Sequence, residues 1–250
     1  MKKLLLLAVL LLFGGMAVTG TLSLEIKESA VPNAVQQLFY RRDGGVLVEV
    51  LDDSGVQLLP SVSPESFTWQ EKVSAPITIG SQTFDVALWD DALLRGAEDR
   101  FILVKNNGVT PCYFRTLLAL ENNGNIFDGR LHLNWNNDAG YTVLADSEDL
   151  CYTDMYGVEH AFKLFVFEYS KPLGVGEIAP PTLLQVALPG YLTEEDLTPL
   201  GGKYEIIAYT QAVWQDAEAE TFDSPDVLEM IFGDKYADIM LERIKDINYP

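Results

Sequence analysis

The chain is poor in the residues that catalytic and metal centres most often use. Its 250 residues include only two histidines and two cysteines. No His-Glu-x-x-His segment occurs, so one helix cannot present two zinc-binding imidazoles. There is also no Gly-x-Ser-x-Gly turn for a serine nucleophile and no glycine-rich phosphate loop. We therefore expect no enzyme, no catalytic residue, no metal site and no cofactor.

Basic residues are scarce as well. The chain has 17 Lys and Arg against 37 Asp and Glu, which gives a formal net charge of −20. Such a chain repels nucleic acid and anionic membrane, so we expect neither as a partner. The excess of acidic residues also favours solubility outside the cell.

Only one long apolar run is present, at the start of the chain. Lys2 and Lys3 precede an unbroken apolar stretch over residues 4–13, and small residues follow over 14–20. This pattern predicts a secretory signal peptide over 1–20 and a secreted protein, with an uncleaved N-terminal anchor as the alternative. No later run reaches the roughly 18 apolar residues of a membrane span. The predicted cleavage region contains Ala17, Gly20 and Thr21.

The two cysteines, Cys112 and Cys151, predict one disulfide in an exported chain. Closing a loop of about 40 residues would stabilise the fold by roughly 4 kcal/mol. Two separate buried thiols are the alternative.

The remaining polar signals favour ordinary surface roles. His132 falls on the polar phase of a predicted strand, and His160 falls in a predicted turn. Four acidic clusters read as solvated loops, because none has the spacing of an EF-hand, and calcium binding there is left open. The clusters are 52–53, 90–91, 146–149 and 194–196.

Short β-rich segments separated by turn signals predict one all-β domain over residues 21–250, a jelly-roll-like sandwich with short helical insertions. Asp43-Gly44 and Gly80-Ser81 are typical hairpin turns, and 106–111 is a further turn. The predicted strands are 35–41, 46–51, 77–79, 83–88, 101–105, 113–120, 131–135, 141–145, 161–169, 183–188 and 204–213.

Helix signals gather near the end of the sequence. Ser224 and Pro225 suit the first positions of a helix that Gly233 would end. A second helix over 234–245 would bury one apolar face, formed by Tyr236, Ile239, Met240 and Ile244.

The segment 21–27 has the alternation of a half-buried strand. Leu22, Leu24 and Ile26 share one face, and polar residues share the other. Signal cleavage would leave this strand at the new N-terminus. A free terminal strand either closes its own sheet or adds to the sheet of a neighbour.

Gly20-Thr21 and four longer segments form an ordered series along the chain; the segments are residues 36–59, 101–115, 165–184 and 204–233. In this order and spacing they resemble the camelysin/TasA-like exported proteins, the biofilm-matrix fibre subunits of Gram-positive bacteria. Gly20-Thr21 matches the position at which the mature strand of such proteins usually begins.

The resemblance implies a jelly-roll sandwich and a structural role, in fibres where the N-terminal strand of one subunit completes the sheet of the next. The partners would then be further copies or other matrix proteins, with Leu22, Leu24 and Ile26 as the donor face. The family's aromatic-aspartate start is absent, and neither the two cysteines nor the helices after Gly233 are typical of it. A monomeric surface-binding module and a camelysin-like metallopeptidase are the alternatives, although no zinc ligand set can be placed on this chain.

Overall fold

A computed structural model describes residues 35–43, 46–49, 71–89, 97–125, 131–137, 139–187, 205–215 and 224–248. Several sequence predictions lie outside these residues. They are the signal peptide with Ala17, Gly20 and Thr21, the strand 21–27 with Leu22, Leu24 and Ile26, and the acidic clusters 52–53, 90–91 and 194–196.

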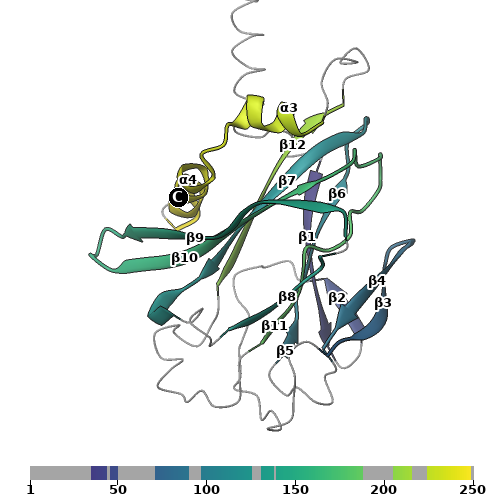
Figure 1. Cartoon of the computed structure of the whole chain (residues 1–250), viewed down its shortest axis with the longest axis horizontal. Coiled ribbons are helices and arrows are strands. Elements are labelled where there is room, and N and C mark those ends of the chain that lie inside the picture. Colours follow the sequence, from purple (N-terminus) through teal and green to yellow (C-terminus); the bar gives the residue numbers. More distant parts are fainter. Residues whose placement is uncertain are drawn as a thin grey trace, which may run out of the picture.

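The prediction of an all-β fold is confirmed. The described residues form antiparallel sheets, with one 3₁₀ turn and two helices near the end of the sequence (Figure 1). The largest sheet has four strands and is called the main sheet below. Its order is β12 (Ile206–Trp214), β7 (Cys112–Glu121), β10 (Glu159–Tyr169) and β9 (Tyr141–Thr153).

Two smaller sheets contribute to the layer that packs against the main sheet, because all three supply side chains to one core. Backbone hydrogen bonds link the two smaller sheets, from Arg100 to Leu184 (2.8 Å) and from Thr182 to Ile102 (2.9 Å). Their strand orders are β2 (Val46–Glu49), β1 (Val35–Asp43), β6 (Phe101–Asn106), and β5 (Ala97–Asp99), β11 (Leu183–Ala187), β8 (His132–Trp135).

Two predicted hairpins are confirmed. β1 pairs with β2, and β3 (Val73–Ile79) pairs with β4 (Gln82–Leu88) around Gly80. Gly80 has φ +61°, a left-handed conformation that glycine adopts without steric cost. The β3–β4 hairpin packs Ile77 and Val86 against Leu38 of β1 and so extends the second layer.

The turn 106–111 is also confirmed, but the strands beside it do not pair with each other. β6 pairs with β1, whereas β7 pairs with β10 and β12. The turn therefore carries the chain from one layer of the sandwich to the other. A turn signal fixes where a strand ends, but it does not determine which strand becomes its partner.

Both helices begin and end close to their predicted bounds. α3 (Ser224–Phe232) stops at Gly233, whose φ of +75° ends the helix and whose N–H donates to the Glu229 carbonyl. α4 (Tyr236–Asn248) follows, with Met240 and Ile244 fully buried.

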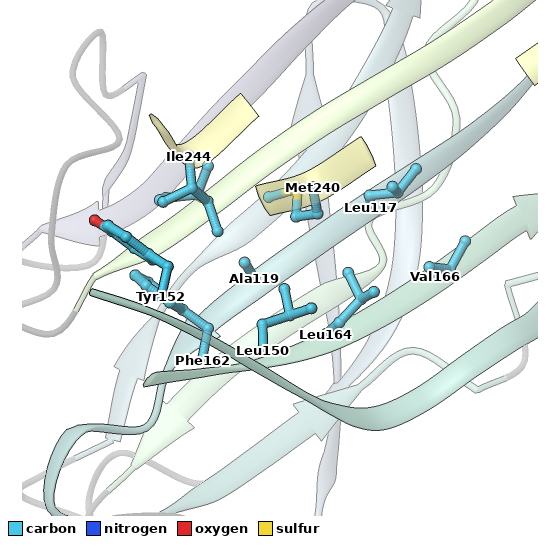
Figure 2. Packing of buried hydrophobic residues seen from close by; sticks show 10 residues of the cluster. Leu117, Ala119, Leu150, Tyr152, Phe162, Leu164, Val166, Met240 and Ile244 are labelled. Carbon is cyan, nitrogen blue, oxygen red and sulfur yellow. The ribbon is translucent and has the colours of Figure 1, made fainter. Parts of the chain in front are cut away.

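The central strands of the main sheet are buried on both faces. Leu118 and Phe165 face the second layer, whereas Leu117 and Leu164 face α4 (Figure 2). Burial on both faces explains the nearly continuous apolar runs over 117–120 and 162–167. A strand with one face exposed to solvent would instead alternate apolar and polar residues. The face of the main sheet that is turned away from the second layer is called the outer face below. Figure 2 shows Met240 and Ile244 of α4 above it.

A buried arginine joins the helices to the main sheet. The guanidinium of Arg115 on β7 donates to the Gln211 side chain and to the Gly233 carbonyl, each at 2.7 Å. It also lies over the rings of Tyr236 (4.9 Å) and Phe232 (5.8 Å). Burial lowers the pKa of Arg115, and the nearby Tyr236 and Glu168 oppose that shift. Arg115 thus fixes the turn between α3 and α4 against β7.

Leu164→Ala should lower the free energy of unfolding by about 2–5 kcal/mol, because it opens a cavity between β10 and α4. The matched control is Val143→Ala, since Val143 lies on the neighbouring strand and is 54 % exposed. It should cost about 1 kcal/mol or less. Urea denaturation of both variants measures the difference. Equal losses would contradict burial of the outer face by α4.

Candidate interaction site

The two cysteines are not paired, and the predicted disulfide is wrong. Both are free thiols, Cys112 buried at the start of β7 and Cys151 exposed on β9. Cys151 faces Ala161, whose carbonyl accepts the Asn122 N–H at the far end of β7. About ten strand residues, or roughly 30 Å, thus separate the two along the sheet. A disulfide requires Cα atoms within about 7 Å.

The two histidines have different surroundings. His132 is half-buried on β8, and burial lowers its pKa. His160 stacks on the Tyr152 ring at 4.9 Å and contacts Asp154 at 3.2 Å. Within the described ranges, no three His, Cys, Asp or Glu side chains gather in a way that could hold a metal ion.

The acidic cluster 146–149 lies in a strand, not in the loop that the sequence predicts. It belongs to β9, the edge strand of the main sheet, where the β9–β10 register shifts twice and Ser147 has φ +60°. Asp149 binds Lys163 of β10 at 2.6 Å, whereas Asp146 and Glu148 are exposed. Charges and bulges on an edge strand discourage the addition of another strand.

In the other edge strand, β12, the hydrogen bonds to β7 determine which backbone groups point away from the sheet. The backbone N–H of Glu121 donates to the Glu205 carbonyl (3.0 Å), and the backbone N–H of Gln215 donates to the Pro111 carbonyl (2.8 Å). Hydrogen-bonded and non-hydrogen-bonded pairs alternate in an antiparallel ladder. The hydrogen bonds at the two ends of β12 therefore agree that its odd-numbered residues point their N–H and C=O groups toward β7. The even-numbered residues turn their N–H and C=O away from β7; they are Ile206, Ala208, Thr210, Ala212 and Trp214.

The β12 edge differs from the β9 edge in charge. None of the nine residues of β12 is charged, and in the described part of the chain its only strand partner is β7. Beneath it, Thr210 bonds Thr116 of β7 (3.2 Å) and Gln37 of β1 (2.6 Å), which fixes β12 over the second layer. Of the two edges of the main sheet, β12 is therefore the one without electrostatic protection.

The β9–β10 hairpin projects from the sheet, at the left of Figure 1. Its tip is a tight turn in which the Gly157 N–H donates to the Asp154 carbonyl at 3.1 Å. Gly157 has φ +81°, as expected where a turn is closed by a left-handed residue. The Asp154 carboxylate accepts the N–H groups of Tyr156 and Val158, both at 2.8 Å.

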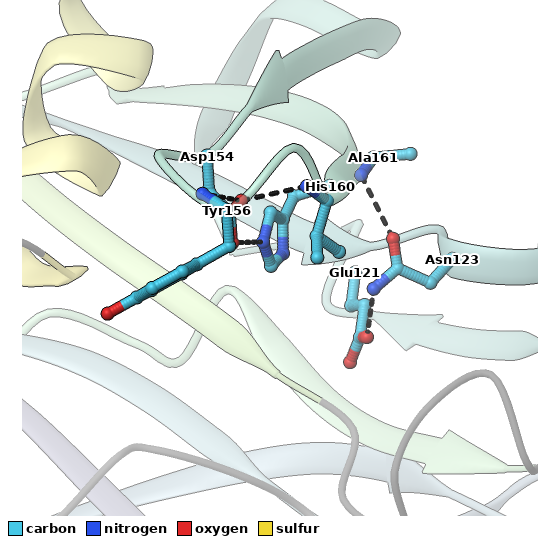
Figure 3. A network of polar contacts seen from close by, with 7 residues as sticks. Glu121, Asn123, Asp154, Tyr156, His160 and Ala161 are labelled. Carbon is cyan, nitrogen blue, oxygen red and sulfur yellow. Dashed lines mark hydrogen bonds and ion pairs between the residues drawn. The ribbon is translucent and has the colours of Figure 1, made fainter.

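The turn holds apolar side chains outward. Figure 3 shows the Tyr156 ring pointing away from the network of Asp154 and His160. Below that network, Asn123 accepts the Ala161 N–H and donates to Glu121, which ties the hairpin to the end of β7. The exposed apolar residues are called the tip cluster below; they are Met155, Tyr156 and Val158.

A second exposed apolar group lies where β7 begins. The Asn106 side chain donates to the carbonyls of Thr110 and Leu173, both at 2.9 Å, and so joins the turn 106–111 to the turn 173–177. Cys112 pairs with Leu173 on one side and with Trp214 of β12 on the other. The exposed apolar residues of these three neighbouring segments are called the end cluster below; they are Val109, Val175 and Trp214.

The sequence did not single out either cluster. Met155, Tyr156, Val109 and Val175 lie in turns, where no apolar periodicity reveals exposure. The available signals were Asp154 followed by Gly157, and Asn106 followed by Gly108, both typical of turns stabilised by a side chain.

A thiol reagent should modify one cysteine of the native protein and both cysteines in denaturant. Cys151 is exposed, whereas burial raises the pKa of Cys112 to about 12 and keeps its thiol protonated and enclosed. Cys151→Ser should leave no reactive thiol in the native state. Absorbance titration of the released chromophore gives both counts. If neither cysteine reacted in denaturant without a reducing agent, the two cysteines would form the disulfide after all.

Lowering the pH should loosen the hairpin tip. Desolvation raises the pKa of Asp154, but hydrogen bonds from Val158, His160 and Tyr156 outweigh it and hold the pKa below the usual 3.8. The anchoring is therefore complete above pH 3.8 and is lost as the pH falls through the lower value of the folded protein. Amide NMR shifts of Tyr156 and Val158 in a dilute sample measure the midpoint. A midpoint at or above 3.8 would contradict the assignment, and Asp154→Asn, which does not titrate, is the control.

None of the helices in the described part of the chain is long and apolar enough to cross a membrane. Comparison with known proteins finds no matching family model, no matching curated protein and no matching solved structure.

Proposed function

We propose that this chain is an exported, non-enzymatic structural protein of the cell surface or extracellular matrix that assembles from copies of itself. In this assembly the segment 21–27 of one copy adds to the β12 edge of the next. Leu22, Leu24 and Ile26 form the face that the neighbour buries.

The observation that carries the proposal is the contrast between the two edges of the main sheet. The β12 edge is uncharged and turns five residues' backbone groups outward, enough for a strand as long as 21–27. The β9 edge carries Asp146 and Glu148, which would repel Glu25 of an incoming strand. An added strand gains backbone hydrogen bonds from the edge and specificity from its alternate side chains.

Burial of the donor face would favour assembly. Burial of three aliphatic side chains contributes about 5–8 kcal/mol before the cost of ordering the strand. A contact between two different surfaces of the same protein repeats from copy to copy, and it gives a fibre when the repeated rotation does not close into a ring. The resemblance to camelysin/TasA-like proteins and the predicted signal peptide point to the same role, in which other matrix proteins would also be partners. The net charge of −20 disfavours nucleic acid or an anionic membrane as the partner.

The chain beginning at Thr21 should form filaments, visible by negative-stain electron microscopy, and a chain beginning at Glu28 should not. Ala208→Pro should have the same effect as this deletion, because it removes an N–H that points away from β7 and leaves the β7 ladder intact. Ala208→Ser keeps the N–H and should assemble normally. Circular dichroism and thermal unfolding establish that all variants fold.

Equal assembly with and without residues 21–27 would refute strand addition. A monomer at every concentration in size-exclusion chromatography would instead indicate a surface-binding module.

A further inference from the structure

The two exposed apolar clusters lie at opposite ends of the main sheet. β7 begins at Cys112, next to the end cluster, and finishes at Glu121, which the network of Asn123 connects to the hairpin. The length of β7 alone is about 30 Å. The tip cluster therefore cannot reach the end cluster of its own chain.

Both clusters are strongly exposed and held in place. Met155 and Tyr156 are 75 % and 82 % exposed, and Val109 is 87 % exposed, whereas residues of these types are normally covered at least in part. The hydrogen bonds of Asp154 fix one cluster, and those of Asn106 fix the other. A backbone that is ordered before binding loses less entropy when a partner covers it.

In the part of the chain that the structure describes, the charges near the two clusters have opposite sign. The tip cluster lies between Asp154 and the exposed Glu159. Among the described residues, the end cluster lies near the exposed Lys171 and the half-buried Lys105, and the nearby acidic residue Glu177 accepts the Gly174 N–H at 2.8 Å. Opposite charges around apolar contacts favour one orientation of docking over others.

We propose that the tip cluster of one copy docks on the end cluster of the next copy. This proposal rests on the proposed function, because three residues a side bury too little surface for a stable complex on their own. The contact joins two different surfaces, as strand exchange does, so both contacts can repeat along the same assembly. Strand addition would supply most of the affinity, and the clusters would set the direction in which copies follow one another.

Disulfide trapping tests the contact. Tyr156→Cys and Val109→Cys are introduced together in a Cys151→Ser background, where Cys112 is enclosed. Oxidation should then give a ladder of covalent oligomers on non-reducing gels, because the two thiols of one chain are too far apart to pair. Each single variant forms at most dimers. The control pairs Tyr156→Cys with Met230→Cys on α3, since Met230 is exposed (62 %) but outside the end cluster, and it should give no ladder.

A second measurement uses no cysteines. Tyr156→Ser with Val158→Ser should weaken association about tenfold or more, as measured by sedimentation velocity. Met230→Ser should leave it unchanged. Glu159→Lys should weaken association, and Lys171→Glu in the same chain should restore it in part.

The outcomes separate the two proposals. Filaments of the intact chain without a ladder would refute the docking of the clusters and leave strand exchange in place. A ladder that also forms from chains beginning at Glu28 would support docking and refute the need for the strand. A ladder equally strong in the Met230 control would show random collision and would refute the proposal.

Discussion

Burial of β7 and β10 on both faces is the constraint on which the rest of the structure depends. A strand with Leu117 facing one way and Leu118 the other needs two covering layers. The second β layer supplies one, and α4 supplies the other. Arg115 then fixes the turn before α4 against β7, so the helix keeps its place over the sheet. Because both faces of these central strands are covered, the edges and the ends of the main sheet are the parts left for contacts with other molecules.

These remaining surfaces are unequal. One edge is acidic and irregular, and the other is uncharged and regular. The two ends both expose apolar side chains, one on a hairpin tip and the other on two turns and the neighbouring end of β12. The proposed self-assembly in one direction would use both asymmetries. Tyr156 and Val109 are each accompanied by exposed apolar neighbours at a rigid turn, and a group of this kind is the part of a surface that a partner can cover.

The strands and helices were largely predictable because their signals are local. Gly80, Ser224 and Gly233 end or begin elements for reasons contained in a few neighbouring residues. Pairing was not predictable, because the partners of Cys112 and Asp149 are set by residues far along the chain. Asn134 illustrates the same limit: it alternates as a polar surface residue would, yet it is buried, bonding Gln185 and the Ala87 carbonyl. The exposure of the turn residues could not be predicted from the sequence either, because it depends on which side chains the completed fold leaves uncovered.

The acidic β9 edge has a consequence for the shape of any assembly. Two such edges brought side by side would place Asp146 and Glu148 of one copy against those of another, and the repulsion would fall off within about 10 Å at moderate salt. Threads built from this subunit would therefore stay thin in dilute salt. They would gather into bundles only when added ions screen the carboxylates, so ionic strength would control the thickness of the proposed fibres.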